Sequence, residues 1–225
     1  MLPKPVTQNY PHMLRQLIAN EIFQQNRIYQ LSKFLLLFFS FGAICLGFIN
    51  PVDKVAELLP IFLMISIPLS VLHVTGYVFR EDVASGRFDI LMTAYTSWQI
   101  VIGKYVSLCI QYFLVFTLII PSIGLIITAN IADLALLTGL STLLMLQSIA
   151  LCVLLGAIQS YFVSSSNYLA VLLLPSIIPT IIIAGLIYAG NLAITNISIL
   201  FGINLVTSPL CLYLSGYLMA NLYNF

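Results

Sequence analysis

The charged side chains of this 225-residue chain lie almost entirely in its first half. After Lys104 the only charged side chain is that of Asp133, and residues 134–225 contain none. Soluble domains carry about 25% charged residues, whereas this chain carries 7% together with 61% hydrophobic residues. The distribution therefore excludes an ordinary soluble domain and is typical of a protein that crosses a membrane several times.

Sequence motifs for catalysis, metal binding and nucleic-acid binding are missing. The 8 basic and 7 acidic side chains form no basic cluster of the kind that neutralises phosphates. The four cysteines lie in apolar runs without the spacing of a metal or redox pair, so we predict no metal site. No phosphate-binding loop occurs, and no serine, histidine and carboxylate set suits acyl transfer. We expect no catalytic residues in this chain and no enzymatic activity; any ATPase would be a separate polypeptide.

Six apolar segments are long enough, or nearly so, to cross the roughly 30 Å core of a bilayer as helices. They are residues 31–49, 58–79, 100–128, 134–162, 168–190 and 197–222. All basic residues except Lys54 lie in the N-terminal region or in the second connection, where Arg80 and Arg87 are followed by Lys104 at the start of the third segment. This distribution places both termini on the cytoplasmic side or its equivalent. We therefore predict an all-α protein in which residues 31–225 form a domain of six transmembrane helices.

Residues 1–30 are too polar to cross the membrane but contain an amphipathic pattern. Leu14, Leu17, Ile18 and Ile22 recur at helical spacing and would share one face. We expect a helix that lies in the cytoplasmic headgroup region, where basic side chains reach anionic membrane lipid. A frayed soluble tail is the alternative, because prolines occur at positions 3, 5 and 11.

The connection over residues 79–99 is unusually long and charged for a link between two membrane spans. Its charged residues alternate with apolar ones, so we predict one or two short amphipathic helices that hinge at Gly86, where a positive φ costs glycine little. Such helices would fit a groove on a cytoplasmic partner. A solvated loop that only fixes the topology is the other interpretation.

Two prolines lie one helical turn apart in the fifth predicted span, at Pro175 and Pro179. Each removes a backbone hydrogen bond and clashes with the preceding turn, so we predict a bent helix. The freed carbonyls need partners that lipid does not offer, so this helix is expected to face protein or a cavity. A gating hinge and a static packing kink both fit the pattern.

The loop carries the first part of a family resemblance. Phe79-Arg80-Glu81-Asp82, with Gly86, Asp89, Leu91 and the later Gly103-Lys104, resembles the loop between the second and third spans of ABC-2-type permeases. Residues 172–184 resemble the leucine-proline-x-x-isoleucine-proline segment of the CcmB family, haem exporter protein B of cytochrome c maturation. The serine-proline at 208–209 also matches, and the resemblance covers most of residues 10–215.

The resemblance implies a permease subunit of an ABC transporter in a bacterial or mitochondrial inner membrane. A partner ATPase, CcmA, would use the ATP, and CcmC and CcmD would belong to the same assembly. ATP turnover would be linked to haem handling and to release of a haem-loaded chaperone, with haem as a handled ligand rather than a bound cofactor. The residues implied to couple to the ATPase are Arg80, Glu81, Asp82, Gly86, Arg87, Phe88, Asp89 and Leu91.

Three further interpretations stay open at the level of sequence. A generic ABC-2 exporter of a lipid, glycan or drug would share the loop. A scaffold that transports nothing would only transmit the motion of the ATPase. Because ABC transporters need two permease units, a homodimer or a pairing with CcmC is a further option.

Overall fold

The computed structural model describes residues 10–28, 30–49, 52–127, 131–161, 173–190 and 194–223. Within these ranges all regular secondary structure is helical, as predicted. The helices are α1 (Tyr10–Ile28), α2 (Leu31–Ile49), α3 (Val52–Thr75), α4 (Arg80–Ala84), α5 (Arg87–Ala94), α6 (Ser97–Ile127), α7 (Ile131–Tyr161), α9 (Leu173–Tyr188) and α10 (Ile194–Tyr223).

Five of these helices, α2, α3, α6, α7 and α10, are long and apolar enough to cross a membrane. Helices α6 and α7 have 31 residues each, which at about 1.5 Å per residue exceeds a hydrocarbon core of about 30 Å. The fifth predicted span is represented by α9, a shorter apolar helix, and the first residues of that span lie outside the described residues. The chain is therefore a multi-pass helical membrane protein.

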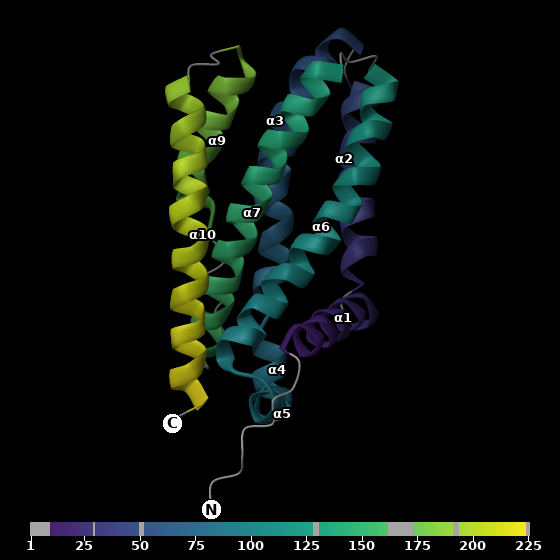
Figure 1. Ribbon diagram of the computed structural model, residues 1–225. Coiled ribbons are helices and arrows are strands. Elements are labelled where there is room, and N and C mark those ends of the chain that lie inside the picture. Colours follow the sequence, from purple (N-terminus) through teal and green to yellow (C-terminus); the bar gives the residue numbers. More distant parts are fainter. Residues whose placement is uncertain are drawn as a thin grey trace, which may run out of the picture.

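The long helices run side by side, and the short helices gather at one end of the bundle (Figure 1). Helix α1 crosses that end, next to α4 and α5, and the last turn of α10 lies at the same end. Residues 1–9 of the predicted N-terminal segment lie outside the described residues. The region predicted to face the cytoplasm is thus one spatial unit, made of α1, α4, α5 and the beginning of α6.

The core of the bundle is apolar and comes mainly from α2, α3, α6 and α7. Phe39, Leu63, Val115 and Leu144 are each fully buried in it. Large apolar side chains also cover the outer surface, such as Phe48, which is 87% exposed. In a bilayer this costs little, because lipid tails are as apolar as the side chains that they contact. Packing between these helices therefore depends on shape more than on removal from water.

The two prolines of α9 lie on its exposed side. Pro179 is inside the helix, and both Pro175 and Pro179 are exposed. The opposite face, with Ile177 and Ala184, is fully buried, and α9 packs against α3, α7 and α10. We expected this helix to face protein or a cavity, and its buried face packs against other helices of the chain, while the prolines lie on the exposed face.

Helix α1 is packed onto α6 rather than frayed. Leu17 of α1 is 1% exposed, and a Cβ atom at Gly103 of α6 would lie only 2.8 Å from a methyl carbon of Leu17. The absent side chain at Gly103 therefore allows the two helices to approach closely. Of the predicted apolar face, Leu17 is buried, while Leu14 and Ile22 are half-buried.

Candidate functional site

The connection after α3 folds into two short helices, α4 and α5, as predicted. Gly86 separates them with φ 72° and ψ 3°, a left-handed conformation that a residue with a Cβ adopts only with strain. The chain then becomes extended at Tyr95 before α6 begins. The turn at Gly86 brings α5 back alongside α4 at the end of the bundle (Figure 1).

A capping box fixes the start of α6 directly after the loop. The backbone N–H of Gln99 donates to the hydroxyl of Thr96 at 3.4 Å, and the backbone N–H of Thr96 donates to the Gln99 side chain at 2.9 Å. This reciprocal pair satisfies two backbone N–H groups that an α-helix leaves free at its N-terminus. The loop and the first turn of α6 are therefore joined by a defined geometry.

The eight residues predicted to couple to an ATPase divide between two faces of the loop. Arg80, Glu81 and Asp89 are exposed, and the neighbouring Ile90 is 70% exposed. By contrast, Asp82 and Phe88 are buried, and Arg87, Gly86 and Leu91 are partly buried. A partner protein can contact the exposed residues directly. The buried Asp82 and Phe88 affect such a partner only by fixing the position of the loop.

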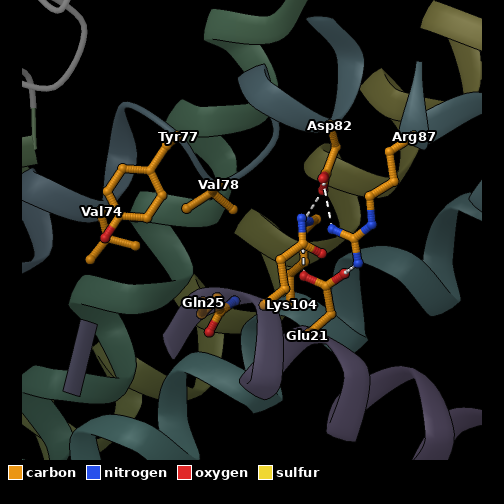
Figure 2. Close-up of a pocket in the computed structure, with 9 residues that line it drawn as sticks. Glu21, Gln25, Val74, Tyr77, Val78, Asp82, Arg87 and Lys104 are labelled. Atoms are coloured by element: carbon orange, nitrogen blue, oxygen red, sulfur yellow. Dashed lines mark hydrogen bonds and ion pairs between the residues drawn. The ribbon is translucent and has the colours of Figure 1, made fainter. Parts of the chain in front are cut away.

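The buried face of the loop contributes to a closed ring of four charged side chains (Figure 2). The Arg87 guanidinium donates to Asp82 at 2.7 Å and to Glu21 at 2.8 Å. The Lys104 ammonium donates to the other oxygen of Glu21 at 2.9 Å and to the other oxygen of Asp82. Acidic and basic groups alternate around the ring, and every carboxylate oxygen has one cationic partner. We call these four residues the charge ring.

Burial makes the charge ring sensitive to the loss of any member. The side chains of Glu21, Asp82 and Lys104 are at most 4% exposed, and that of Arg87 is 25% exposed. Desolvation offsets much of the attraction in a buried ion pair, so the ring adds little to the net stability of the folded protein. Removal of one member, however, leaves a buried charge without its counter-ion, which is strongly unfavourable. The ring therefore specifies how α1, α4, α5 and α6 fit together.

Polar contacts continue from the charge ring along the junction between α1 and α6. The side-chain amide of Gln25 donates to the hydroxyl of Ser107 at 3.0 Å, and the amide of Gln111 donates to Gln25. Gln25, Ser107 and Gln111 are all buried. Ser32 of α2 donates to Asn26 of α1 at 2.6 Å, which ties the second helix to the same end. Helix α1 is thus held by directional bonds as well as by the contact of Leu17 with Gly103.

Sequence reasoning overlooked Glu21 and Lys104 as members of a site. The relevant signal was present, because Glu21 lies within the apolar stripe of α1 and Lys104 is a lone cation inside a long apolar span. An ionisable residue inside a membrane segment, such as Lys104, almost always has a polar or charged partner, and an acidic side chain that is buried in an apolar stripe, such as Glu21, is almost always paired. These rules predict a partner for each, although they do not say which one.

A large apolar groove lies between α6 and α7, with a volume of about 770 Å³. Phe113, Leu118 and Met145 are among the residues that line it. Its two threonine hydroxyls donate to backbone carbonyls of their own helices, from Thr117 to Phe113 and from Thr142 to Thr138, both at 2.7 Å. The groove thus offers few polar groups to a ligand.

Two bacterial proteins are similar to this chain over most of its length. The uncharacterized protein RC0356 of Rickettsia conorii is 29% identical over 208 residues, which cover 92% of this chain and 96% of the relative. The uncharacterized protein RP268 of Rickettsia prowazekii is 30% identical over the same length, with the same coverage. No model of a known protein family matches the chain, and no solved structure matches it significantly.

Proposed function

The chain belongs to the same family as these two rickettsial proteins, and we propose that it is the permease subunit of an ABC-type complex for cytochrome c maturation. In this proposal it has six transmembrane helices, with α9 as part of the fifth, and its short helices face the cytoplasm. It lies in the inner membrane of a bacterium, which the source of both relatives favours over a mitochondrion. The CcmB-like residues of the loop and of the proline segment support the cytochrome assignment.

The two-faced loop is the observation that carries this proposal. Its exposed face, with Glu81, Asp89 and Ile90, offers charges and an apolar side chain to a cytoplasmic partner. Its buried face is joined through the charge ring to Lys104 of α6, a helix long enough to cross the membrane. A push on the exposed face would therefore move α6 and α1 together with the loop. This is the property that a permease needs to respond to a separate ATPase.

The partners in this proposal follow from the family resemblance. A cytoplasmic ATPase of the CcmA type binds the loop and hydrolyses ATP, and CcmC and CcmD complete the membrane assembly. The work of ATP hydrolysis is used in haem handling, through release of the haem-loaded chaperone. A scaffold that only transmits this motion would use the same loop and ring.

The apolar groove between α6 and α7 favours one alternative, a generic exporter of a lipid or of an apolar drug. Its volume of about 770 Å³ and its apolar lining suit a molecule without charges. The exporter would use the loop in the same way. The two functions differ in the effect of disabling the loop. A maturation permease would lose c-type cytochromes, whereas an exporter would lose the export of an apolar compound.

The test is a double charge reversal on the exposed face, Glu81→Lys with Asp89→Lys, in the chromosomal copy of the gene. These side chains are exposed, so the fold should tolerate the change, while docking of an oppositely charged partner surface should fail. We expect the c-type cytochrome content to fall several-fold and the haem-loaded chaperone to accumulate. The membrane level of the variant, measured by immunoblot, must equal that of the wild type.

Asp133→Lys provides the matched control, because Asp133 is an exposed acid in the first turn of α7, at the other end of the bundle. This variant should keep normal cytochromes. Normal cytochromes in a complete deletion of the gene would refute the maturation function and leave the exporter. Equal loss in the loop and control variants would refute the role of the loop.

A further inference from the structure

Besides the groove between α6 and α7, a cavity with a volume of about 490 Å³ lies between α1 and α5. It is at the end of the bundle where the short helices gather (Figure 1). Two guanidinium groups line it, those of Arg27 near the end of α1 and Arg87 at the start of α5. The side-chain amides of Asn20 and Gln24 also line it, and none of its lining residues is acidic. The cavity therefore has the groups that bind an anion, without a carboxylate of its own among them.

Both arginines retain hydrogen-bonding capacity for a ligand. Arg87 uses one N–H of each terminal nitrogen for Asp82 and Glu21, and a guanidinium has further N–H donors. The guanidinium carbon of Arg27 lies 5.9 Å from the centre of the Phe23 ring, and Arg27 forms no ion pair with any residue that the structure describes. A planar guanidinium matches the oxygen atoms of a phosphate group better than an ammonium does.

The surroundings of the cavity point to a lipid as the source of that phosphate. Phe23 and Ile28 line the cavity and are 65% and 55% exposed. Helix α1 lies across the end of the bundle, where headgroups meet acyl chains when the long helices cross a membrane (Figure 1). Exposed apolar side chains beside arginines are typical of that interface. A soluble phosphate would make no use of Phe23 or Ile28.

We propose that this cavity binds the phosphate group of an anionic phospholipid from the leaflet at this end of the bundle. Arg27 and Arg87 hold the phosphate, the amides of Asn20 and Gln24 bond its oxygen or headgroup atoms, and the acyl chains lie along Phe23 and Ile28. Because Arg87 is also a member of the charge ring, the bound lipid contacts the element that joins the loop to α6. The proposal does not depend on what the protein transports.

The test uses the full-length protein purified in detergent, with phosphatidylglycerol as the probe, and measures the rise in thermal midpoint over a lipid titration. We expect Arg27→Gln to weaken the apparent affinity by about tenfold or more, because a hydrogen bond between two charged groups is stronger than one between neutral groups. Arg15→Gln is the control, because Arg15 is exposed on the same helix but does not line the cavity. It should leave the titration unchanged.

Two further probes separate a lipid from its parts. Phosphatidylcholine, which has no net charge, should give little shift, and inorganic phosphate alone should give less than phosphatidylglycerol does. The proposal is overturned if Arg27→Gln and Arg15→Gln behave alike, if phosphatidylcholine matches phosphatidylglycerol, or if inorganic phosphate reproduces the whole effect. Native mass spectrometry of the wild type should in addition show retained phosphatidylglycerol that Arg27→Gln loses.

Discussion

The junction between α1 and α6 and the junction between α7 and α10 are built on different chemistry. The first contains the Glu21 to Lys104 ion pair and the bond from Gln25 to Ser107. The second is the more extensive contact, yet the polar contact that the described residues show across it is 3.4 Å between the Ser160 hydroxyl and the sulfur of Met219, a weak acceptor. The single hydroxyl hydrogen of Ser160 has a shorter bond, at 2.8 Å, to the carbonyl of Ala157 in its own helix. Apolar packing tolerates small shifts of one helix against the other, whereas ion pairs and the hydrogen bonds of side-chain amides fix one arrangement. The specific junction is the one next to the loop.

Among the variants that test this comparison, Lys104→Met should have the largest effect on stability. The variant leaves Glu21 and Asp82 buried with Arg87 as the remaining counter-ion of the ring, and loss of one partner from a buried ion pair costs about 3–5 kcal/mol. We expect a strong fall in the yield of folded protein and in the thermal midpoint in detergent. Lys33→Met, at an exposed lysine of α2, should have almost no effect, and similar losses in the two variants would contradict the role of the ring.

A double-mutant cycle of Glu21→Gln and Lys104→Met should sharpen the comparison. Each single change leaves an uncompensated charge, but the double variant retains the neutral pair of Asp82 and Arg87. The double variant should therefore be more stable than the sum of the single effects predicts, by a coupling energy of about 0.5–3 kcal/mol. The measurement is the free energy of unfolding of all four proteins in the same detergent. Additive effects would mean that the two residues do not interact.

The smallest expected effect comes from a matched pair of buried serines. The hydroxyls of Ser107 and Ser215 both donate to a carbonyl of their own helix. Among the residues that the structure describes, only the hydroxyl of Ser107 also accepts a bond from another helix, from Gln25. Ser107→Ala should therefore be less stable than Ser215→Ala by about 0.6 kcal/mol, the average for such bonds in membranes. The same unfolding assay measures the difference. A greater loss in Ser215→Ala would show that the polar bonds of α1 do not distinguish the two junctions.

Sequence reasoning was most successful where local rules decide the structure. The span predicted at 31–49 is α2, and the loop forms two short helices that turn at Gly86 with a positive φ. Apolar length and the conformational freedom of glycine are properties of a few consecutive residues, so they are visible in the sequence.

The charge ring was not predicted, because it depends on contacts between distant parts of the chain. Glu21 meets Lys104 across 83 positions and Arg87 across 66. Helical periodicity gave the face of α1 that carries Leu17, but it does not say which helix covers that face. For the same reason the eight loop residues were predicted as one group, whereas the fold turns Asp82 inward and Glu81 outward.

The central claim is that the exposed face of the loop binds the ATPase and that the charge ring transmits its motion to α6. The direct measurement is co-purification of the partner ATPase, together with c-type cytochrome content, for two variants. We predict that Glu81→Lys with Asp89→Lys loses both the ATPase and the cytochromes, whereas Glu21→Gln with Lys104→Met, which retains the neutral pair of Asp82 and Arg87 within the loop, keeps the ATPase bound but loses most of the cytochromes. The claim would be contradicted if this second variant released the ATPase equally, or if it kept both at the level of the wild type.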